Sequence, residues 1–149
     1  YPVGRLDRNS EGLLIMTNDG ELANLLMHPS SHVPKKYRVT VAGSVGDEAI
    51  AAMSEGIVVD GGRTAPCMIH VLQKEPGRTV LEMTLFEGKN RQIRKMCESV
   101  GLEVARLKRI SIGPLKLGML GPGQKRELTP EEVHLLKTAA SKREDRFDD

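Results

Sequence analysis

The chain has 149 residues, of which 39% are hydrophobic and 28% are charged, and its formal net charge at pH 7 is +2. The length fits one domain with a substantial core, and the composition is ordinary for a soluble globular protein. No apolar run approaches the length of a membrane span, so we expect no membrane partner.

The first third of the sequence predicts alternating strands and helices. Residues 13–17 form an apolar run that predicts a buried strand, and the turn formers that follow it end the strand. Helical spacing of leucines predicts a short helix over residues 21–27, which the proline at position 29 stops. Apolar and polar side chains then alternate over residues 37–41, which predicts a strand with one buried face.

The middle of the chain predicts one helix and three strands. Helical spacing between two glycines indicates a helix over residues 47–55. Strands are expected over residues 57–60 and 65–73, around a Gly-Gly turn. A Pro-Gly pair then joins the last of these to a strand over residues 79–86, as a hairpin.

The last third predicts two helices and one more strand. Apolar residues at i, i+3, i+4 and i+7 from Ile93 form one stripe of a helix, which Gly101 is placed to cap. Residues 104–112 predict a strand. Thr129 is the expected N-cap of a final helix, with a proline and two acidic residues in its first turn, that runs to about residue 140.

The order of these elements predicts the fold class. Helices and antiparallel strands in mixed order indicate an α+β domain over residues 1–140, built on a mixed, mainly antiparallel sheet with flanking helices. Residues 141–149 alternate charges with almost nothing to bury, and they predict a disordered tail.

The cysteines and histidines do not form a metal-binding or redox motif. Cys67 and Cys97 lie far apart in apolar surroundings, which predicts buried reduced thiols and a cytoplasmic protein. We expect no metal, because the four histidines are scattered: His28, His32, His70 and His134.

Positive charge is concentrated in one segment. Between Gly88 and Arg126 the chain has ten basic residues and two acidic ones, a net charge of +8 by this count. Such a segment is a candidate phosphate-binding surface, and a solvated basic face is the alternative.

The polar loop around Asp7 is the strongest candidate for chemistry. Asp7 lies between Arg5 and Arg8, and nearby positive charge keeps a carboxylate ionised. Such a carboxylate can serve as a nucleophile or as a base. By itself, however, an aspartate in a loop is usually a turn or cap residue.

Four segments together resemble one family. Residues 4–20 (GRLDRNSEGLLIMTNDG), 35–39 (KKYRV), 87–96 (EGKNRQIRKM) and 107–115 (LKRISIGPL) occur in the order found in RsuA-type pseudouridine synthases. Four ordered matches are far more specific than any single one. Members of this family isomerise selected uridines of ribosomal RNA to pseudouridine without a cofactor.

The resemblance implies three catalytic residues. Asp7 matches the family's catalytic aspartate, Arg94 matches the arginine that pairs with it, and Tyr37 matches the tyrosine that lies against the target base. The chemistry of these side chains suits the roles, because a guanidinium pairs with a carboxylate in a planar fork and an aromatic ring stacks on a flipped base. The alternatives are a surface arginine that contacts phosphate and a tyrosine that only packs in the core.

Six further residues are expected to bind the substrate. Arg5 is expected to fill the gap that the flipped base leaves in the RNA, and Leu107 and Ile110 to form the apolar floor of the pocket. Phosphate contacts are expected from three basic residues: Lys89, Arg91 and Lys95.

The chain begins inside the first motif. In the family, a small basic RNA-binding domain, a linker and the first catalytic strands precede this motif. We therefore interpret the chain as the C-terminal portion of a pseudouridine synthase catalytic domain, N-terminally truncated, monomeric, and without the upstream RNA-binding domain.

The function predicted from sequence is isomerisation of uridine to pseudouridine in ribosomal RNA, with the large-subunit RNA favoured. A small-subunit target is the first alternative. A non-catalytic RNA-binding module in ribosome assembly is the second, although Asp7, Tyr37 and Arg94 are all present. A glycosidase would need a second carboxylate beside the bond, and only Glu11 is near.

Overall fold

The fold is built on one long twisted sheet. The computed structural model describes residues 2–4, 6, 8–28, 33–89 and 91–146, and their side chains as far as residue 140. The main sheet has the strand order β10-β9-β4-β8-β7, and β2 pairs with β9 beside this path. Its strands are β2 (Glu11–Gly12), β4 (Lys35–Ala42), β7 (Met68–Glu75), β8 (Arg78–Leu85), β9 (Val104–Ile112) and β10 (Leu115–Lys116).

All pairings in the main sheet are antiparallel except the parallel pair of β2 and β9. The predicted α+β class with a mixed, mainly antiparallel sheet is therefore confirmed. Two short ribbons accompany this sheet, one formed by β1 (Pro2–Val3) and β3 (Ile15–Met16), the other by β5 (Val58–Val59) and β6 (Gly62–Arg63).

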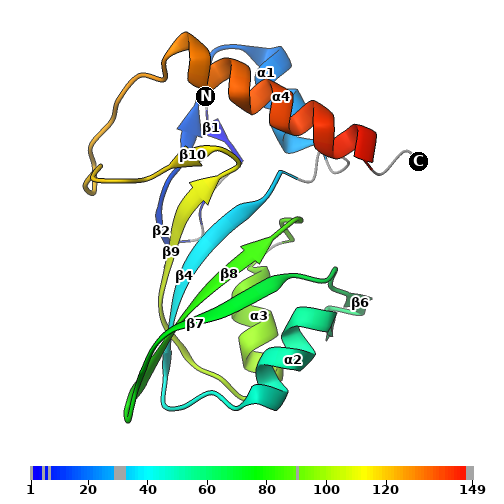
Figure 1. Ribbon diagram of the computed structural model, residues 1–149, viewed down its shortest axis with the longest axis vertical. Helices are drawn as coiled ribbons and strands as arrows, with labels where there is room; N and C mark the ends of the chain where they lie inside the picture. Colours follow the sequence, from blue (N-terminus) through cyan, green and yellow to red (C-terminus); the bar gives the residue numbers. More distant parts are fainter. Residues whose placement is uncertain (1, 5, 7, 29–32, 90, 147–149) are drawn as a thin grey trace.

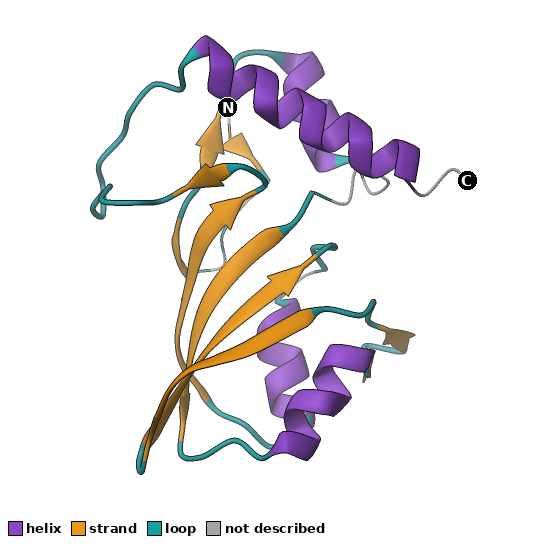
Figure 2. Ribbon diagram, viewed as in Figure 1, coloured by secondary structure: helices purple, strands orange, loops and turns teal. Residues whose placement is uncertain are grey.

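The helices of the described part of the chain lie toward the two ends of the sheet, as Figures 1 and 2 show. The helices are α1 (Gly20–Met27), α2 (Asp47–Glu55), α3 (Gln92–Ser99) and α4 (Pro130–Arg146). The pair α2 and α3 covers one face of the lower half, whereas α1 and α4 lie together over the upper end (Figure 1). No helix in the described part of the chain is long and apolar enough to cross a membrane.

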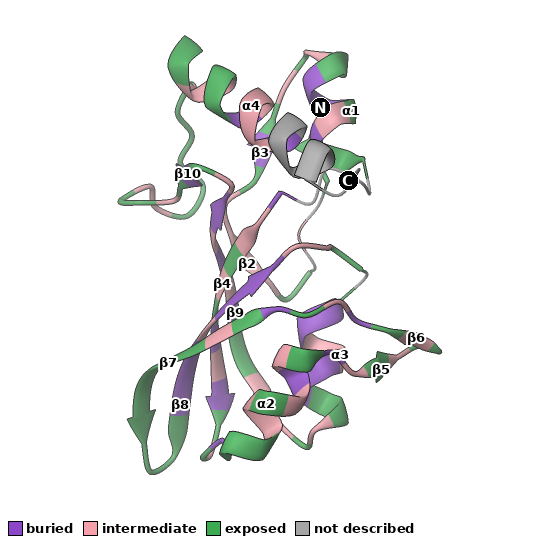
Figure 3. Ribbon diagram, turned by 45° about the vertical axis from the view of Figure 1, so that its right-hand side comes forward, coloured by how far each residue is buried: buried purple, intermediate pink, exposed green. Residues whose placement is uncertain are grey.

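The lower core forms between the sheet and the pair α2 and α3. Val39 and Val41 of β4 are fully buried and alternate with the exposed Arg38, which is the predicted period of a strand with one buried face. Met96 and Cys97, from the predicted apolar stripe of α3, are also fully buried. Figure 3 shows buried segments on β4, β8 and α3 at this level.

The upper core joins α1 and α4 to the ends of β9 and β10. Leu22 and Leu26 of α1 pack with Leu136 of α4 and with Ile112 of β9. Asp19 starts α1, because its side chain accepts hydrogen bonds from two backbone N–H groups of the first turn. The fold therefore has two apolar clusters, one at each end of β9.

Of the buried strand predicted over residues 13–17, only β3 (Ile15–Met16) forms, and of its two residues only Ile15 is buried. Gly12 ends β2 in a positive-φ conformation of 112°, and Leu13 then donates its backbone N–H to the Arg109 carbonyl at 2.9 Å. Beyond this point the chain leaves β9 and pairs with β1 instead. A change of pairing partner requires a bend that hydrophobicity does not reveal.

The last helix is longer than predicted. Its start is as expected, because Thr129 Oγ1 accepts from the Glu132 N–H while Glu132 accepts from the Thr129 N–H, a reciprocal capping box. The expected end near residue 140 is wrong, since α4 continues to Arg146 and takes in most of the predicted tail. No glycine or proline follows Ala140 to end the helix. Residues 147–149 lie outside the described part.

Candidate active site

A cavity of about 690 Å³ lies between the two apolar clusters. This volume is within the range of about 300–1,000 Å³ that small-molecule sites usually have. Leu107 and Ile93 of the lower cluster line it together with Ile15 and Val33 of the upper cluster. Since both clusters contribute walls, the cavity forms only when both ends of the sheet are assembled.

Tyr37 lies in the wall of this cavity. It is half-buried on β4, where it is opposite Met83 of β8 and Arg109 of β9. Strand alternation places Lys35 and Tyr37 on the same face as the buried Val39, and both of the former line the cavity. The structure thus places the predicted stacking residue where an aromatic face is available to a bound ring.

Leu107 lines the cavity from β9, as expected, but Ile110 does not line its described part. The physical reason is strand alternation, because Ile110 is three residues after Leu107 and so lies on the opposite face of β9. A β-bulge at Ile110, where Lys36 is opposite Ser111 but Tyr37 is opposite Arg109, then brings Ile112 to the cavity face. The expected pocket floor is therefore formed by Leu107 with Arg109 and Ile112, and not with Ile110.

Arg109 is a site residue that the sequence analysis missed. Strand alternation places it on the same face of β9 as Leu107, inside the cavity, where it is only 6% exposed. Its Nε donates to the Leu13 carbonyl at 2.8 Å, and its buried Nη2 has no hydrogen-bond partner in the described structure. In the sequence Arg109 is one of three basic residues of β9, and Arg106 and Lys108 lie outside the described cavity wall.

Lys35 is a second residue of this kind. It lines the cavity from the start of β4, and burial lowers the pKa of its ammonium group, with a further contribution from the positive charge of Arg109. In the sequence it is one of two adjacent lysines. Only the pleat of β4 separates it from Lys36, which is exposed and lies 3.8 Å from Glu82.

Arg94 connects α3 to the loop of the first motif. It is half-buried, and its Nη2 donates to the carbonyl of Asn9 at 2.5 Å. Its Nε is buried without a hydrogen-bond partner in the part of the chain that the structure describes. Asp7 and Arg5 lie outside the described residues, so the ion pair of Asp7 with Arg94 remains a prediction. The observed contact is two residues away from Asp7.

The three predicted phosphate contacts do not lie together. Lys89 and the exposed Arg91 line the cavity at the start of α3. Lys95 instead forms an ion pair at 2.5 Å with Asp60, on the turn between β5 and β6, and is not among the described residues of the cavity wall. The expectation for Lys95 therefore changes to a contact between α3 and that turn.

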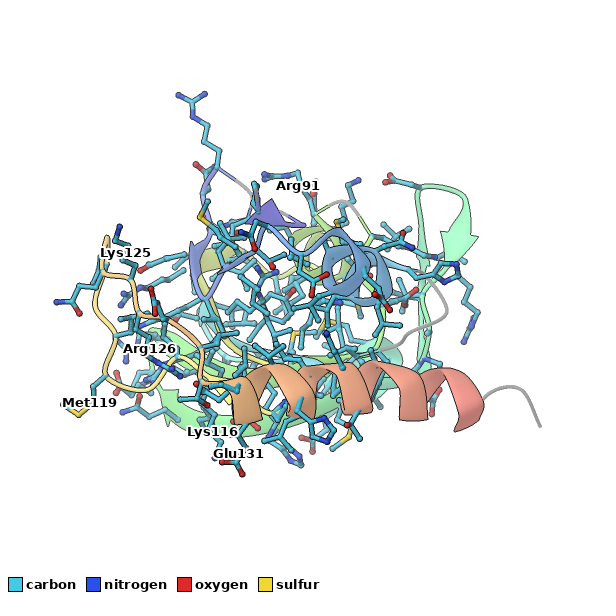
Figure 4. All side chains as sticks on the ribbon, turned by 90° about the horizontal axis from the view of Figure 1, so that it is seen from above. Arg91, Lys116, Met119, Lys125, Arg126 and Glu131 are labelled. Carbon is cyan, nitrogen blue, oxygen red and sulfur yellow. The ribbon has the colours of Figure 1, made fainter. Side chains whose placement is uncertain are left out.

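The basic segment of residues 88–126 does not form a single surface. Figure 4 shows Arg91 at the top of the view, Lys116 near the bottom, and Lys125 and Arg126 on a loop at the left edge. A further two of its residues, Arg106 and Lys108, line a separate hollow of about 220 Å³ together with Arg38, Thr40 and Arg78. Strand alternation and the loop before α4 thus distribute the positive charge over several faces.

The two cysteines are free and buried, as predicted. Burial raises the pKa of both the Cys67 and the Cys97 thiol to about 11, so neither is a reactive thiolate at neutral pH. The described residues contain no group of three or more histidine, cysteine, aspartate or glutamate side chains able to hold a metal ion.

Comparisons with known proteins point to one family. The family model described as RNA pseudouridylate synthase matches residues 1–99. An uncharacterized RNA pseudouridine synthase of Bacillus subtilis is 44% identical over 138 residues, which is 91% of this chain and 58% of that protein. The ribosomal large subunit pseudouridine synthase B of the same organism is 43% identical over 142 residues, or 94% of this chain and 58% of that protein.

A solved structure has the same fold. It is described as a crystal structure of pseudouridylate synthase, and it aligns with a TM-score of 0.85 and 32% sequence identity over 91% of this chain and 59% of its own. The chain thus spans a little over half the length of these relatives.

Proposed function

Because the chain belongs to the RNA pseudouridylate synthase family, we propose that it catalyses the isomerisation of uridine to pseudouridine in ribosomal RNA. The observation that carries this proposal is the cavity, with Tyr37 in its wall and Arg94 bonded to the motif loop at Asn9. A flipped uridine needs an aromatic ring to stack on, and a catalytic carboxylate needs a cationic partner such as a guanidinium.

The proposed target is the large-subunit RNA. Similarity to a ribosomal large subunit pseudouridine synthase over 94% of this chain supports this choice. A uridine of the small-subunit RNA is the alternative.

The reaction breaks the bond between N1 of uracil and C1′ of ribose, turns the base, and joins C5 to C1′. Asp7 is the proposed carboxylate, acting as nucleophile or as base, and Arg94 is its proposed partner. Tyr37 is proposed to stack on the base while the base is detached. No cofactor is needed, because nothing is oxidised and no group enters from outside.

The proposed setting is a longer protein. We propose an upstream basic RNA-binding domain that selects the site, and a monomer that acts in the cytoplasm. The buried free thiols support a reducing compartment. Phosphate contacts at the rim of the cavity give affinity but little sequence information, so site selection needs further contacts.

The test compares ribosomal RNA from cells with and without the gene, by mapping pseudouridines in both subunits. One or more sites should disappear from the large-subunit RNA and return when the gene is restored. An Asp7→Asn version, which keeps the shape of the side chain but removes its charge, should fold and fail to restore them. Unchanged pseudouridine maps in both subunits would contradict the proposed function.

A further inference from the structure

Two positively charged side chains in the wall of the cavity, those of Lys35 and Arg109, form no ion pair with a described residue. Arg109 is more than nine-tenths buried, and its Nη2 has no hydrogen-bond partner in the described structure. The ammonium group of Lys35 forms no hydrogen bond or ion pair with another described residue, and it too lines the cavity. Burying an unsatisfied cationic donor is costly, so such a pair implies a ligand that supplies the missing acceptors.

The charged neighbours in the wall do not supply these acceptors. Glu87 is the carboxylate among the described residues of the cavity wall, and it already accepts from the Ala65 backbone N–H and from Nε2 of Gln92 at 3.0 Å. Lys89 lies 3.8 Å from the same carboxylate. Apart from burial, the like charge of Arg109 lowers the pKa of Lys35, as expected where no carboxylate faces it among the described residues.

The position of the two cations relative to Tyr37 indicates which part of the substrate they meet. Arg109 is directly opposite Tyr37 across β4 and β9, and Lys35 is two residues before Tyr37 on the same face of β4. A base stacked on the Tyr37 ring therefore has both cations near its edge. The edge of uracil carries the O2 and O4 carbonyl oxygens, which are hydrogen-bond acceptors.

Resting on the proposed function, we propose that Lys35 and Arg109 bind the carbonyl oxygens of the target uracil and stabilise the negative charge that the base acquires during isomerisation. When the N1–C1′ bond breaks, its electron pair remains on the base and is shared by N1, O2 and O4. The new C5–C1′ bond uses a ring electron pair, C5 loses its proton, and N1 gains one. Atoms and charges balance without another reactant.

This role does not depend on how Asp7 acts. If the carboxylate attacks ribose or removes a sugar proton, the base leaves as an anion. If it adds to C6, the C5–C6 electron pair moves onto O4 as an enolate. In each route the negative charge reaches a carbonyl oxygen, and fixed cations in a poorly solvated site stabilise it strongly.

The test replaces Lys35 by methionine, whose side chain is also unbranched and only one atom shorter, but carries no charge. Loss of one such electrostatic contact should lower the single-turnover rate on ribosomal RNA by about 100-fold, with less than a threefold change in the Kd for the RNA. Melting temperature should not fall, because the substitution removes repulsion with Arg109 from a buried site. Lys35→Arg keeps the charge and should recover most of the rate.

The matched control is Lys36→Met, on the adjacent and exposed residue outside the described cavity wall. It should keep the wild-type rate. If the protein at its natural length forms no pseudouridine, the proposed function fails. If the wild-type protein forms pseudouridine, and Lys35→Met either stays within threefold of the wild-type rate or loses activity only because it unfolds, the role of Lys35 and Arg109 is wrong while the proposed function stands.

A substrate substitution distinguishes the base from the phosphate as the bound group. RNA with 4-thiouridine at the target position has a weaker hydrogen-bond acceptor, so Lys35→Met should lower its rate much less than it lowers the rate with uridine. RNA with a neutral methylphosphonate at the target phosphate should lower both rates by the same factor. If Lys35→Met instead suppresses the methylphosphonate effect, the cations bind phosphate and the proposal is overturned.

Discussion

Replacing Gly12 by alanine should detach β2 from β9 and displace the loop that carries the proposed catalytic residue. Gly12 has a φ of 112°, which L residues rarely adopt. A Cβ atom at this position would meet the backbone oxygen and nitrogen of Arg109 well inside contact distance. These atoms belong to the β9 backbone, which β4 holds on its other side, so neither can move aside easily.

The expected loss of stability has two parts. Backbone strain at the positive φ costs about 1–2 kcal/mol, and overpacking against a fixed backbone costs about 1–3 kcal/mol. A loss of about 3 kcal/mol lowers the melting temperature of a domain of this size by roughly 10 °C. If β2 separates locally instead, the same free energy appears as lost protection of the Leu13 N–H, which donates to the Arg109 carbonyl.

Gly101→Ala is the matched control. Gly101 has a φ of 80°, but a Cβ atom there would meet nothing within 4 Å, so only the strain applies. Thermal unfolding and amide hydrogen exchange of both variants measure the difference, and pseudouridine formation should be lost only with Gly12→Ala. Equal melting temperatures for the two variants, together with unchanged Leu13 protection, would refute the close packing of β2 on β9.

Three further predictions concern single side chains. Arg94→Met should abolish most activity and lower the free energy of unfolding by about 1.5–3 kcal/mol, the usual value of a hydrogen bond to a charged group. Lys95→Met, beside it on α3, should have little effect on turnover. Equal turnover rates and melting temperatures for the two variants would place Arg94 outside the site. Tyr37→Phe should keep RNA binding while lowering turnover and Tyr37→Ala should lose activity, so a wild-type rate for the alanine variant would assign Tyr37 to core packing. The hydrogen bond from Arg126, with that from the Thr129 N–H, lowers the pKa of Glu132 from 4.5 to about 2. The ionised Glu132 should therefore stabilise the fold above pH 4.5, and this contribution should be lost as the pH falls toward 2. A difference in melting temperature between the wild type and Arg126→Gln that stays constant over that range would contradict this.

The sequence by itself determined the elements whose signals are local. The helix over residues 47–55 and the strand over residues 104–112 have the predicted bounds, and the Pro-Gly hairpin joins β7 to β8 as expected. The capping box at Thr129 is also a local signal, since its two hydrogen bonds join residues three apart. Periodicity and turn chemistry depend on neighbours in the chain, so a single sequence is sufficient to read them.

Tertiary structure decided which side chains enter the cavity. Ile112 lines it instead of Ser111 because of a bulge in the pairing of β4 with β9. These strands join residues about 70 positions apart in the chain, as the partners Tyr37 and Arg109 illustrate. The same dependence on distant partners shortened the strand predicted over residues 13–17 to β3 and turned Lys95 toward Asp60. Register arises from pairing between distant segments, and a one-residue shift in it changes the face on which every following side chain lies.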